Sequence, residues 1–181
     1  MIDTIKVPSL QEVSSTSREL LENVQQKLGM VPNLYATIGY SSSALKAMLD
    51  TEATLTKDAS FSAKEREAIN LIVSQVNQCD YCLAAHTALA KMRGFSEADT
   101  LAIRIANYSD AKLNLVLQLA ASIAENKGSG DTDLKEDFFD AGYDHKALVE
   151  LIALIALRSF TNFVFSNIKV PVDFPAAAPL N

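Results

Sequence analysis

Cysteine, histidine, glycine and proline are all scarce in this sequence. Its 181 residues include 2 cysteines, 2 histidines, 6 glycines and 5 prolines. Two cysteines are too few for the disulfide framework of a small secreted domain, and a chain of this length can bury a sufficient core without one. The shortage of glycine and proline leaves long stretches without turn signals, which favours helices.

Positive charge and long apolar runs are scarce as well. Lysine and arginine number 16 against 22 acidic residues, a net charge of −6, which excludes a basic stripe for nucleic acid or anionic lipid. The first residues lack the basic and apolar segments of a signal peptide. The longest apolar run, 147–157, is interrupted by Glu150 and is far shorter than the roughly 20 residues of a membrane span. We therefore expect a soluble, cytoplasmic protein with no nucleic-acid or membrane partner.

Apolar residues recur at helical spacing through almost the whole chain. This pattern predicts an all-α fold in a single domain over residues 1–181. The Pro-rich segment 168–181 is expected to lie extended over the surface as a tail. The predicted helices cover residues 15–28, 43–56, 63–78, 82–94, 99–107, 111–126, 135–141 and 145–167.

A weak internal repeat accompanies this pattern. Shifting the chain by 80 residues aligns 66–87 with 146–167, and the apolar positions largely coincide. In that register Ser159 and Asn162 stand opposite the two cysteines. Either one helical unit occurs twice, as two pseudo-repeats of which only the first keeps reactive side chains, or two buried helices share a similar period.

Both cysteines and one histidine fall within the segment "CDYCLAAH". Positions three and four apart share a helix face, so Cys79, Cys82 and His86 line up. An imidazole one turn from Cys82 can accept its thiol proton and so produce a nucleophilic thiolate. If Cys82 is oxidised to a sulfenic acid, Cys79 is close enough to condense with it into a disulfide.

Glu67 joins this group only if the chain turns back at residues 76–78. In one continuous helix, Glu67 and Cys82 would lie about 22 Å apart. In a hairpin, Glu67 faces His86, where its carboxylate would orient the imidazole and raise its basicity. The turn also brings both cysteines near a helix N-terminus, whose dipole favours a thiolate at Cys79, whereas the imidazole favours Cys82. These arguments leave open which cysteine reacts.

Two unreactive or non-redox interpretations compete with this one. Cys79, Cys82, His86 and Glu67 number four possible zinc ligands, yet structural zinc sites usually draw on two cysteine or histidine pairs and the second is missing. We therefore expect no metal. The cysteines could also be inert residues that pack in the core as small apolar groups.

Other polar and aromatic residues receive structural interpretations. Glu65 completes a capping box with Ser62, and His145 follows Asp144 at a helix start, so it is expected at the surface. Four aromatic residues could line a pocket, but aromatic residues at helical spacing are usually core, and we expect them there: Tyr35, Tyr40, Phe61 and Tyr81.

The spacing of Glu67, Cys79, Cys82 and His86 resembles that of the alkylhydroperoxidase AhpD branch of the carboxymuconolactone decarboxylase family. The flanks 29–41, "GMVPNLYATIGYS", and 167–175, "NIKVPVDFP", resemble its peroxidase-related members. The likeness therefore covers nearly the whole chain. It implies an AhpD-like all-α fold of packed helical hairpins, assembly into homotrimers or hexamers, and thiol peroxidase activity.

The resemblance also implies a role for each residue. Cys82 would attack the peroxide and become the sulfenic acid, and Cys79 would give up a proton and then form the disulfide with Cys82. Glu67 and His86 would form the proton relay. An external dithiol, such as a thioredoxin-like or lipoyl protein, would reduce the disulfide, and no cofactor is needed because the two sulfurs carry both electrons.

The two residues between the cysteines depart from the family pattern. Well-studied members carry a histidine between the cysteines, where this chain has Asp80 and Tyr81, so the relay there is altered.

A lactone decarboxylase on the same fold would use His86 and Glu67 and would not need the thiols. A noncatalytic redox sensor would use the dithiol only to switch its oligomeric state.

Overall fold

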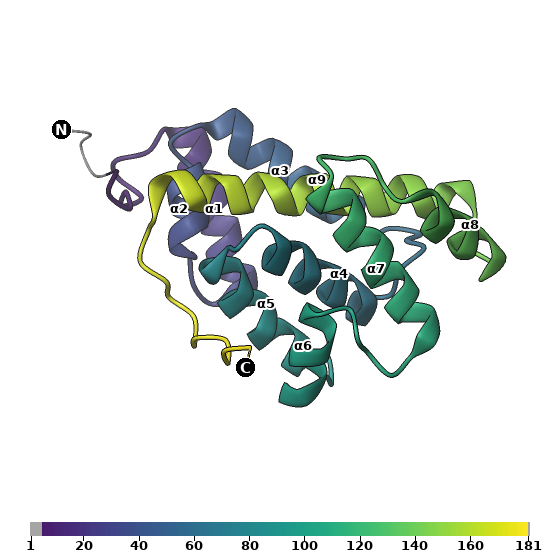
Figure 1. The fold of residues 1–181 in the computed structure, drawn as a ribbon. Coiled ribbons are helices and arrows are strands. Elements are labelled where there is room, and N and C mark those ends of the chain that lie inside the picture. Colours follow the sequence, from purple (N-terminus) through teal and green to yellow (C-terminus); the bar gives the residue numbers. More distant parts are fainter. Residues whose placement is uncertain (1–4, 181) are drawn as a thin grey trace.

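The computed structural model describes residues 5–180; residues 1–4 and 181, which the predicted domain and tail include, lie outside it. Within the described range the chain is all-helical, as predicted, with nine α-helices and no strand. The helices are α1 Ser15–Leu28, α2 Asn33–Ile38, α3 Ser42–Thr54, α4 Ala63–Val76, α5 Asp80–Met92, α6 Glu97–Arg104, α7 Ala111–Glu125, α8 Thr132–Asp140 and α9 His145–Ile168. All eight predicted helices are present, and Figure 1 shows their arrangement.

Helix α2 is the element that the sequence analysis missed. It has six residues, fewer than two turns, so its apolar period is too short to recognise. Pro32, which ends the preceding loop, is also the N-cap of α2. A proline at the edge of a helix can therefore mark a start as well as a break, because its fixed φ suits the first turn.

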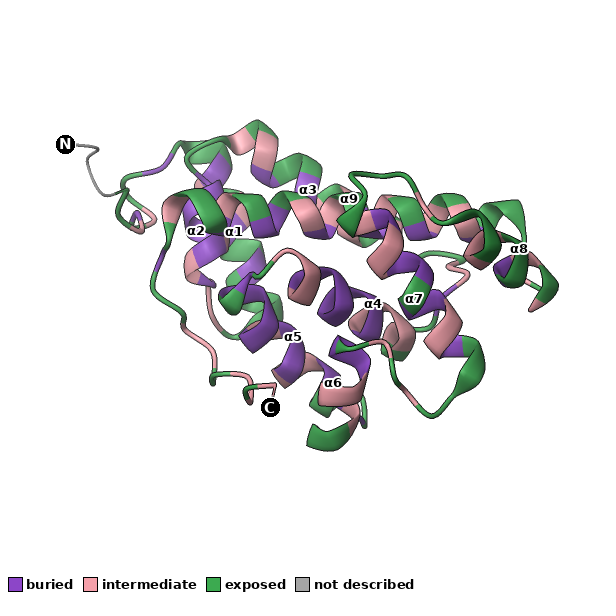
Figure 2. Cartoon of the chain, viewed as in Figure 1, coloured by how far each residue is buried: buried purple, intermediate pink, exposed green. Residues whose placement is uncertain are grey.

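Helix α4 lies at the centre of the larger hydrophobic core. It packs against α5, α6, α7 and α9 (Figure 1). Ile69, Leu71 and Val73 are completely buried, and all residues from 68 to 74 are buried (Figure 2). Its N-terminus carries the predicted capping box, in which the Ser62 amide donates to Glu65 and the Glu65 amide donates to Ser62.

A second core joins α1, α2 and α3 to the C-terminal half of α9. Cys79, Tyr81 and Cys82 belong to this cluster, together with Leu45 and Phe165. The first turn of α5 is thus packed between the two cores. The dithiol is therefore surrounded by apolar side chains, and the polar groups near it come from a few specific positions.

The chain reverses between α4 and α5, as the hairpin hypothesis predicts. Helix α4 ends at Val76, Gln78 has a left-handed φ of 52°, and Cys79 is the N-cap of α5. The Asn77 side chain donates to Asn162 Oδ1 at 2.9 Å, a hydrogen bond that ties the turn to α9. The two helices then pack side by side.

The sequence repeat does not correspond to a repeated structural unit. Residues 66–87 form a helical hairpin, whereas residues 146–167 lie within the single helix α9. The shared feature is therefore only the apolar period of two buried segments, which was the second of the two interpretations.

Helix α9, predicted over 145–167, extends on both sides of the apolar run 147–157. By length and composition it could cross a membrane, with a mean hydropathy of 1.8. Its inner face, however, carries Arg158, Thr161 and Asn162, all buried against other helices of the bundle. Burial of hydrogen-bonded polar groups against several neighbouring helices is typical of the core helix of a soluble bundle.

The C-terminal segment lies extended, and hydrogen bonds from α2, α5 and α6 hold its described part to the helices. The Asn33 amide donates to Asp173 Oδ2 at 2.8 Å, and Arg104 Nη1 donates to the carbonyl of Ala178 at 2.6 Å. The segment thus runs from the end of α9 past α2 to α6 (yellow in Figure 1).

The capping box of α4 generates a stability prediction. Ser62→Ala removes the side chain that accepts the Glu65 amide, so the free energy of unfolding should fall by about 1 kcal/mol in denaturant titrations. Ser43→Ala, an exposed site within α3, is the matched control and should change stability by less than about 0.5 kcal/mol. Equal losses in the two variants would contradict the capping role.

Candidate functional site

The two cysteines occupy the first turn of α5. Cys79 is the N-cap and its sulfur accepts the backbone amide of Cys82 at 3.4 Å. Both are free thiols, and they are only 1% and 2% exposed. The sulfurs therefore lie close together in a protected environment, on one side of the helix.

The surroundings of the two thiols make them unequal. A hydrogen bond from Cys79 lowers the pKa of Cys82 to about 6, with help from the charges of Arg158 and His86 and against the effect of burial. The same hydrogen bond, with burial, raises the pKa of Cys79. Although Cys79 holds the cap position that the helix dipole favours, Cys82 is the sulfur that ionises first.

Glu67 and His86 meet across the α4–α5 hairpin. Glu67 Oε2 lies 2.7 Å from His86 Nδ1, and the two side chains are only 15% and 8% exposed. Burial raises the pKa of Glu67, but His86, Arg158 and Asn70 outweigh it and hold the pKa below its usual value. The carboxylate can thus fix the orientation of the ring and stabilise it when it carries a second proton.

A buried arginine from α9 completes the site, and the sequence analysis missed it. The Arg158 guanidinium donates to Asn70 Oδ1 and Thr161 Oγ1, each at 3.2 Å, and lies 3.6 Å from Glu52 Oε1. Its side chain is 7% exposed. A charge this deep is stable only if it is paired and hydrogen-bonded, and these three partners meet that need.

The partners of Arg158 have further contacts, Thr161 with Cys82 and Glu52 with Tyr35. Cys82 Sγ lies 4.0 Å from Thr161 Oγ1, the hydroxyl that also accepts from Arg158. On the other side, the Tyr35 hydroxyl donates to Glu52 at 3.1 Å. A signal for Arg158 was present in the sequence, because it is the one charged residue in 151–168, where an ionised group needs buried partners.

The two residues between the cysteines play no part in the Glu67–His86 pair. Asp80 is exposed in the first turn of α5. Tyr81 is buried, its hydroxyl donates to Asp173 Oδ1 at 2.5 Å, and it accepts the Leu34 amide at 3.2 Å. Tyr81 therefore links α5 to α2 and to the C-terminal segment.

The remaining expectations have mixed outcomes. His145 is exposed at the start of α9, and Phe61 and Tyr81 are buried, all as predicted. Tyr35 is only partly buried, and the prediction that Tyr40 is a core residue was wrong, because Tyr40 is 53% exposed at the turn between α2 and α3.

Across residues 5–180, no three His, Cys, Asp or Glu side chains are grouped so that they could hold a metal ion.

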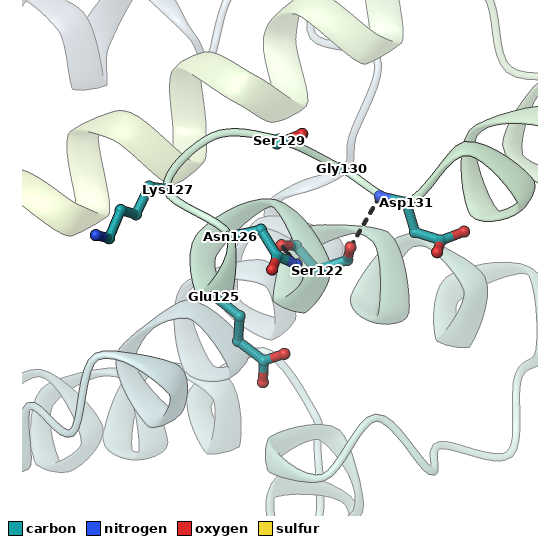
Figure 3. A pocket seen from close by; sticks show the side chains of 7 residues that line it. All are labelled: Ser122, Glu125, Asn126, Lys127, Ser129, Gly130 and Asp131. Carbon is teal, nitrogen blue, oxygen red and sulfur yellow. Dashed lines mark hydrogen bonds between the residues drawn. The ribbon is translucent and has the colours of Figure 1, made fainter.

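Two surface hollows lie away from the dithiol. The first is polar and follows the loop between α7 and α8, where the Asp131 amide donates to Ser122 Oγ at 2.9 Å (Figure 3). The second is apolar and lies between the α2–α3 turn and α9. Neither is lined by Glu67, Cys79, Cys82 or His86.

A family model describes part of the chain. Residues 43–126 match the carboxymuconolactone decarboxylase family, a range that contains the four predicted site residues. No curated protein matches the sequence.

Several solved structures share the fold over nearly the whole chain. An uncharacterized peroxidase-related protein from Ralstonia eutropha JMP134, described as an alkylhydroperoxidase AhpD core, has 21% identity and a TM-score of 0.83, covering 96% of this chain and 93% of its own. A peroxidase-related protein from Silicibacter sp. TM1040 has 22% identity and a TM-score of 0.74, covering 98% and 93%. The debrominase Bmp8, as a cysteine-to-alanine variant with 2,3,4-tribromopyrrole, has 18% identity and a TM-score of 0.79, covering 95% and 93%.

The unequal thiols generate a prediction for alkylation by iodoacetamide. Only the thiolate reacts, so the rate at Cys82 should fall as the pH drops through about 6, while Cys79 stays unreactive well above that pH. Mass spectrometry of the digested protein assigns each adduct.

Two variants test the hydrogen bond from Cys79. Cys79→Ala removes the donor and should move the alkylation midpoint of Cys82 upward, whereas Cys79→Ser keeps a hydroxyl donor and should move it less. Identical midpoints in the two variants would show that the bond does not set the acidity of Cys82.

Proposed function

Because residues 43–126 match the carboxymuconolactone decarboxylase family model and the chain has the AhpD-like fold, we propose that this protein is a thiol-dependent peroxidase. It reduces hydrogen peroxide or organic hydroperoxides at Cys82. The observation that carries the proposal is the buried Cys79–Cys82 pair at the start of α5, with the Glu67–His86 contact of 2.7 Å on the same helix hairpin. The lowered pKa of Cys82 supports it.

The first half of the reaction activates Cys82 and oxidises it. His86, oriented by Glu67, accepts the Cys82 proton. The thiolate attacks one peroxide oxygen, so that a sulfur–oxygen bond forms as the oxygen–oxygen bond breaks. The alkoxide or hydroxide that leaves takes the proton of Cys79. Cys82 is then a sulfenic acid and Cys79 a thiolate.

The second half closes the disulfide. The Cys79 thiolate attacks the Cys82 sulfur, and the hydroxide that leaves takes the proton held on His86 and departs as water. Two thiols and one organic hydroperoxide thus give one disulfide, one alcohol and one water; with hydrogen peroxide the products are one disulfide and two waters. The two sulfurs supply both electrons, so the balance needs no further cofactor.

An external dithiol closes the cycle by thiol–disulfide exchange, through a mixed disulfide. A thioredoxin-like or lipoyl protein has the required chemistry. Both cysteines must be reduced between turnovers, which fits a reducing compartment such as the cytoplasm.

Assembly into homotrimers or hexamers is part of the proposal. Apolar side chains exposed along α9 support it, because a water-soluble monomer seldom leaves such a stripe uncovered. The exposed residues of this stripe are Val149, Ile152, Phe160 and Phe163.

Acid–base catalysis on a lactone, as the family name suggests, is the second candidate. The buried Glu67–His86 contact at 2.7 Å favours it, because this pair alone could move a proton to or from carbon. In that case the thiols would be dispensable. Redox sensing without turnover is the third, and it predicts a change in oligomer mass on oxidation.

Steady-state turnover with hydrogen peroxide and dithiothreitol tests the proposal, and the smallest peroxide comes first because both sulfurs are buried. Cys82→Ser should abolish activity. Glu67→Gln should lower kcat by about 10²-fold or more, since it removes the charge that orients His86. The exposed Glu136→Gln is the matched control and should keep full activity.

Other outcomes would identify a different function. Activity retained in Cys82→Ser, on peroxide or on a lactone, would overturn the thiol mechanism. Because a debrominase has the same fold, 2,3,4-tribromopyrrole belongs in the substrate panel. A change in oligomer mass without turnover would favour the sensor.

A further inference from the structure

We propose that Arg158 is a positioning residue of the dithiol site: it provides a fixed internal cation that keeps the Cys82 sulfur anionic, and Glu52 limits the strength of that cation. This inference rests on the proposed role of Cys82 as the attacking thiolate. It does not depend on peroxide being the substrate, because the acidity of a thiol can be measured without turnover.

The position of the guanidinium is fixed from three directions. Asn70 on α4 receives its Nε–H, Thr161 on α9 receives Nη1–H, and Glu52 on α3 lies beside Nη2. A planar fork held on both edges has little freedom to turn away from the sulfur. The cation is therefore already in place before Cys82 ionises, and its burial protects it from screening by salt.

Thr161 connects this cation to the sulfur. Its hydroxyl oxygen is 3.2 Å from Arg158 Nη1 and 4.0 Å from Cys82 Sγ, and its side chain is fully buried. Guanidinium and sulfur thus share one fully buried neighbour. In this low-dielectric region the attraction between opposite charges is several-fold stronger than in water.

Charged and titratable groups face Cys82 from five helices, and the sign of each matters. Cys79 and His86 on α5 favour the thiolate, as does Arg158 on α9. Negative charge comes from Glu67 on α4 and Glu52 on α3, and Tyr35 on α2 bears on Glu52 through its hydroxyl. Glu67 is paired with His86. Arg158 is the one permanent cation in this set, because a histidine carries a charge only when it is protonated.

Glu52 offsets part of that positive charge. Its carboxylate lies 3.6 Å from Arg158 and is 29% exposed, so it is partly solvated. Removing the Glu52 charge should strengthen the field of Arg158 at the sulfur, whereas removing the Arg158 charge should weaken it. The two changes therefore shift the same measured quantity in opposite directions.

The alkylation midpoint of Cys82 provides the test, with Arg158→Met, Arg158→Lys and Glu52→Gln compared with wild type. Arg158→Met should raise the midpoint by about one pH unit or more, the usual effect of losing a close opposite charge. Arg158→Lys keeps the charge and should restore most of the difference. Glu52→Gln should lower the midpoint by a smaller amount.

Arg104→Met is the matched control. Arg104 is buried to a similar degree, donates to Gln75 Oε1 at 2.8 Å, and belongs to α6, away from Thr161 and Glu52. Its loss should leave the midpoint of Cys82 unchanged while removing an equally buried charge. Circular dichroism and thermal melting compare the fold of the two methionine variants.

Two results would overturn the inference. One is a folded Arg158→Met protein whose midpoint moves no further than that of Arg104→Met. The other is a Glu52→Gln midpoint at or above the wild-type value, which decides the matter if Arg158→Met does not fold. If the wild-type protein shows no peroxidase activity, that result counts against the proposed function alone and leaves this inference standing.

Discussion

The reversal of the chain between α4 and α5 is the constraint on which the rest of the site depends. A continuous helix would separate Glu67 from His86 by about 28 Å, whereas the turn brings their side chains to 2.7 Å. The same turn starts α5 at Cys79, so the dithiol occupies a helix N-terminus and the two sulfurs share a hydrogen bond. Gln78 accepts a left-handed conformation to make this possible, and Asn77 anchors the turn to α9.

Burial and polarity have separate functions in this arrangement. The apolar second core excludes water from Cys79 and Cys82, which on its own would disfavour a thiolate. Neighbouring groups reverse that effect at Cys82 and reinforce it at Cys79, so that the pair holds one acidic and one protonated sulfur. A dithiol divided in this way combines a nucleophile with a proton donor, as the proposed peroxide reduction requires.

Most of the fold could be predicted because helical periodicity is a local property of the sequence. Helix α2 could not, since six residues do not establish a period. The four candidate site residues could be grouped from the sequence because a stretch of 20 residues contains all of them and one turn relates them. Arg158, Glu52 and Tyr35 come from α9, α3 and α2, and only tertiary packing brings them near α5. The unbroken α9, by contrast, was predicted as one helix over 145–167, because its helical period continues without a turn signal.

The central claim is that Cys82 is the sulfur that peroxide oxidises. The most direct measurement treats the Cys79→Ser protein with one equivalent of hydrogen peroxide in the presence of dimedone, followed by peptide mass spectrometry. The account predicts a dimedone adduct on Cys82, and a Cys79–Cys82 disulfide without adduct in wild type. An unmodified Cys82 in the Cys79→Ser protein, with the fold intact, would contradict it.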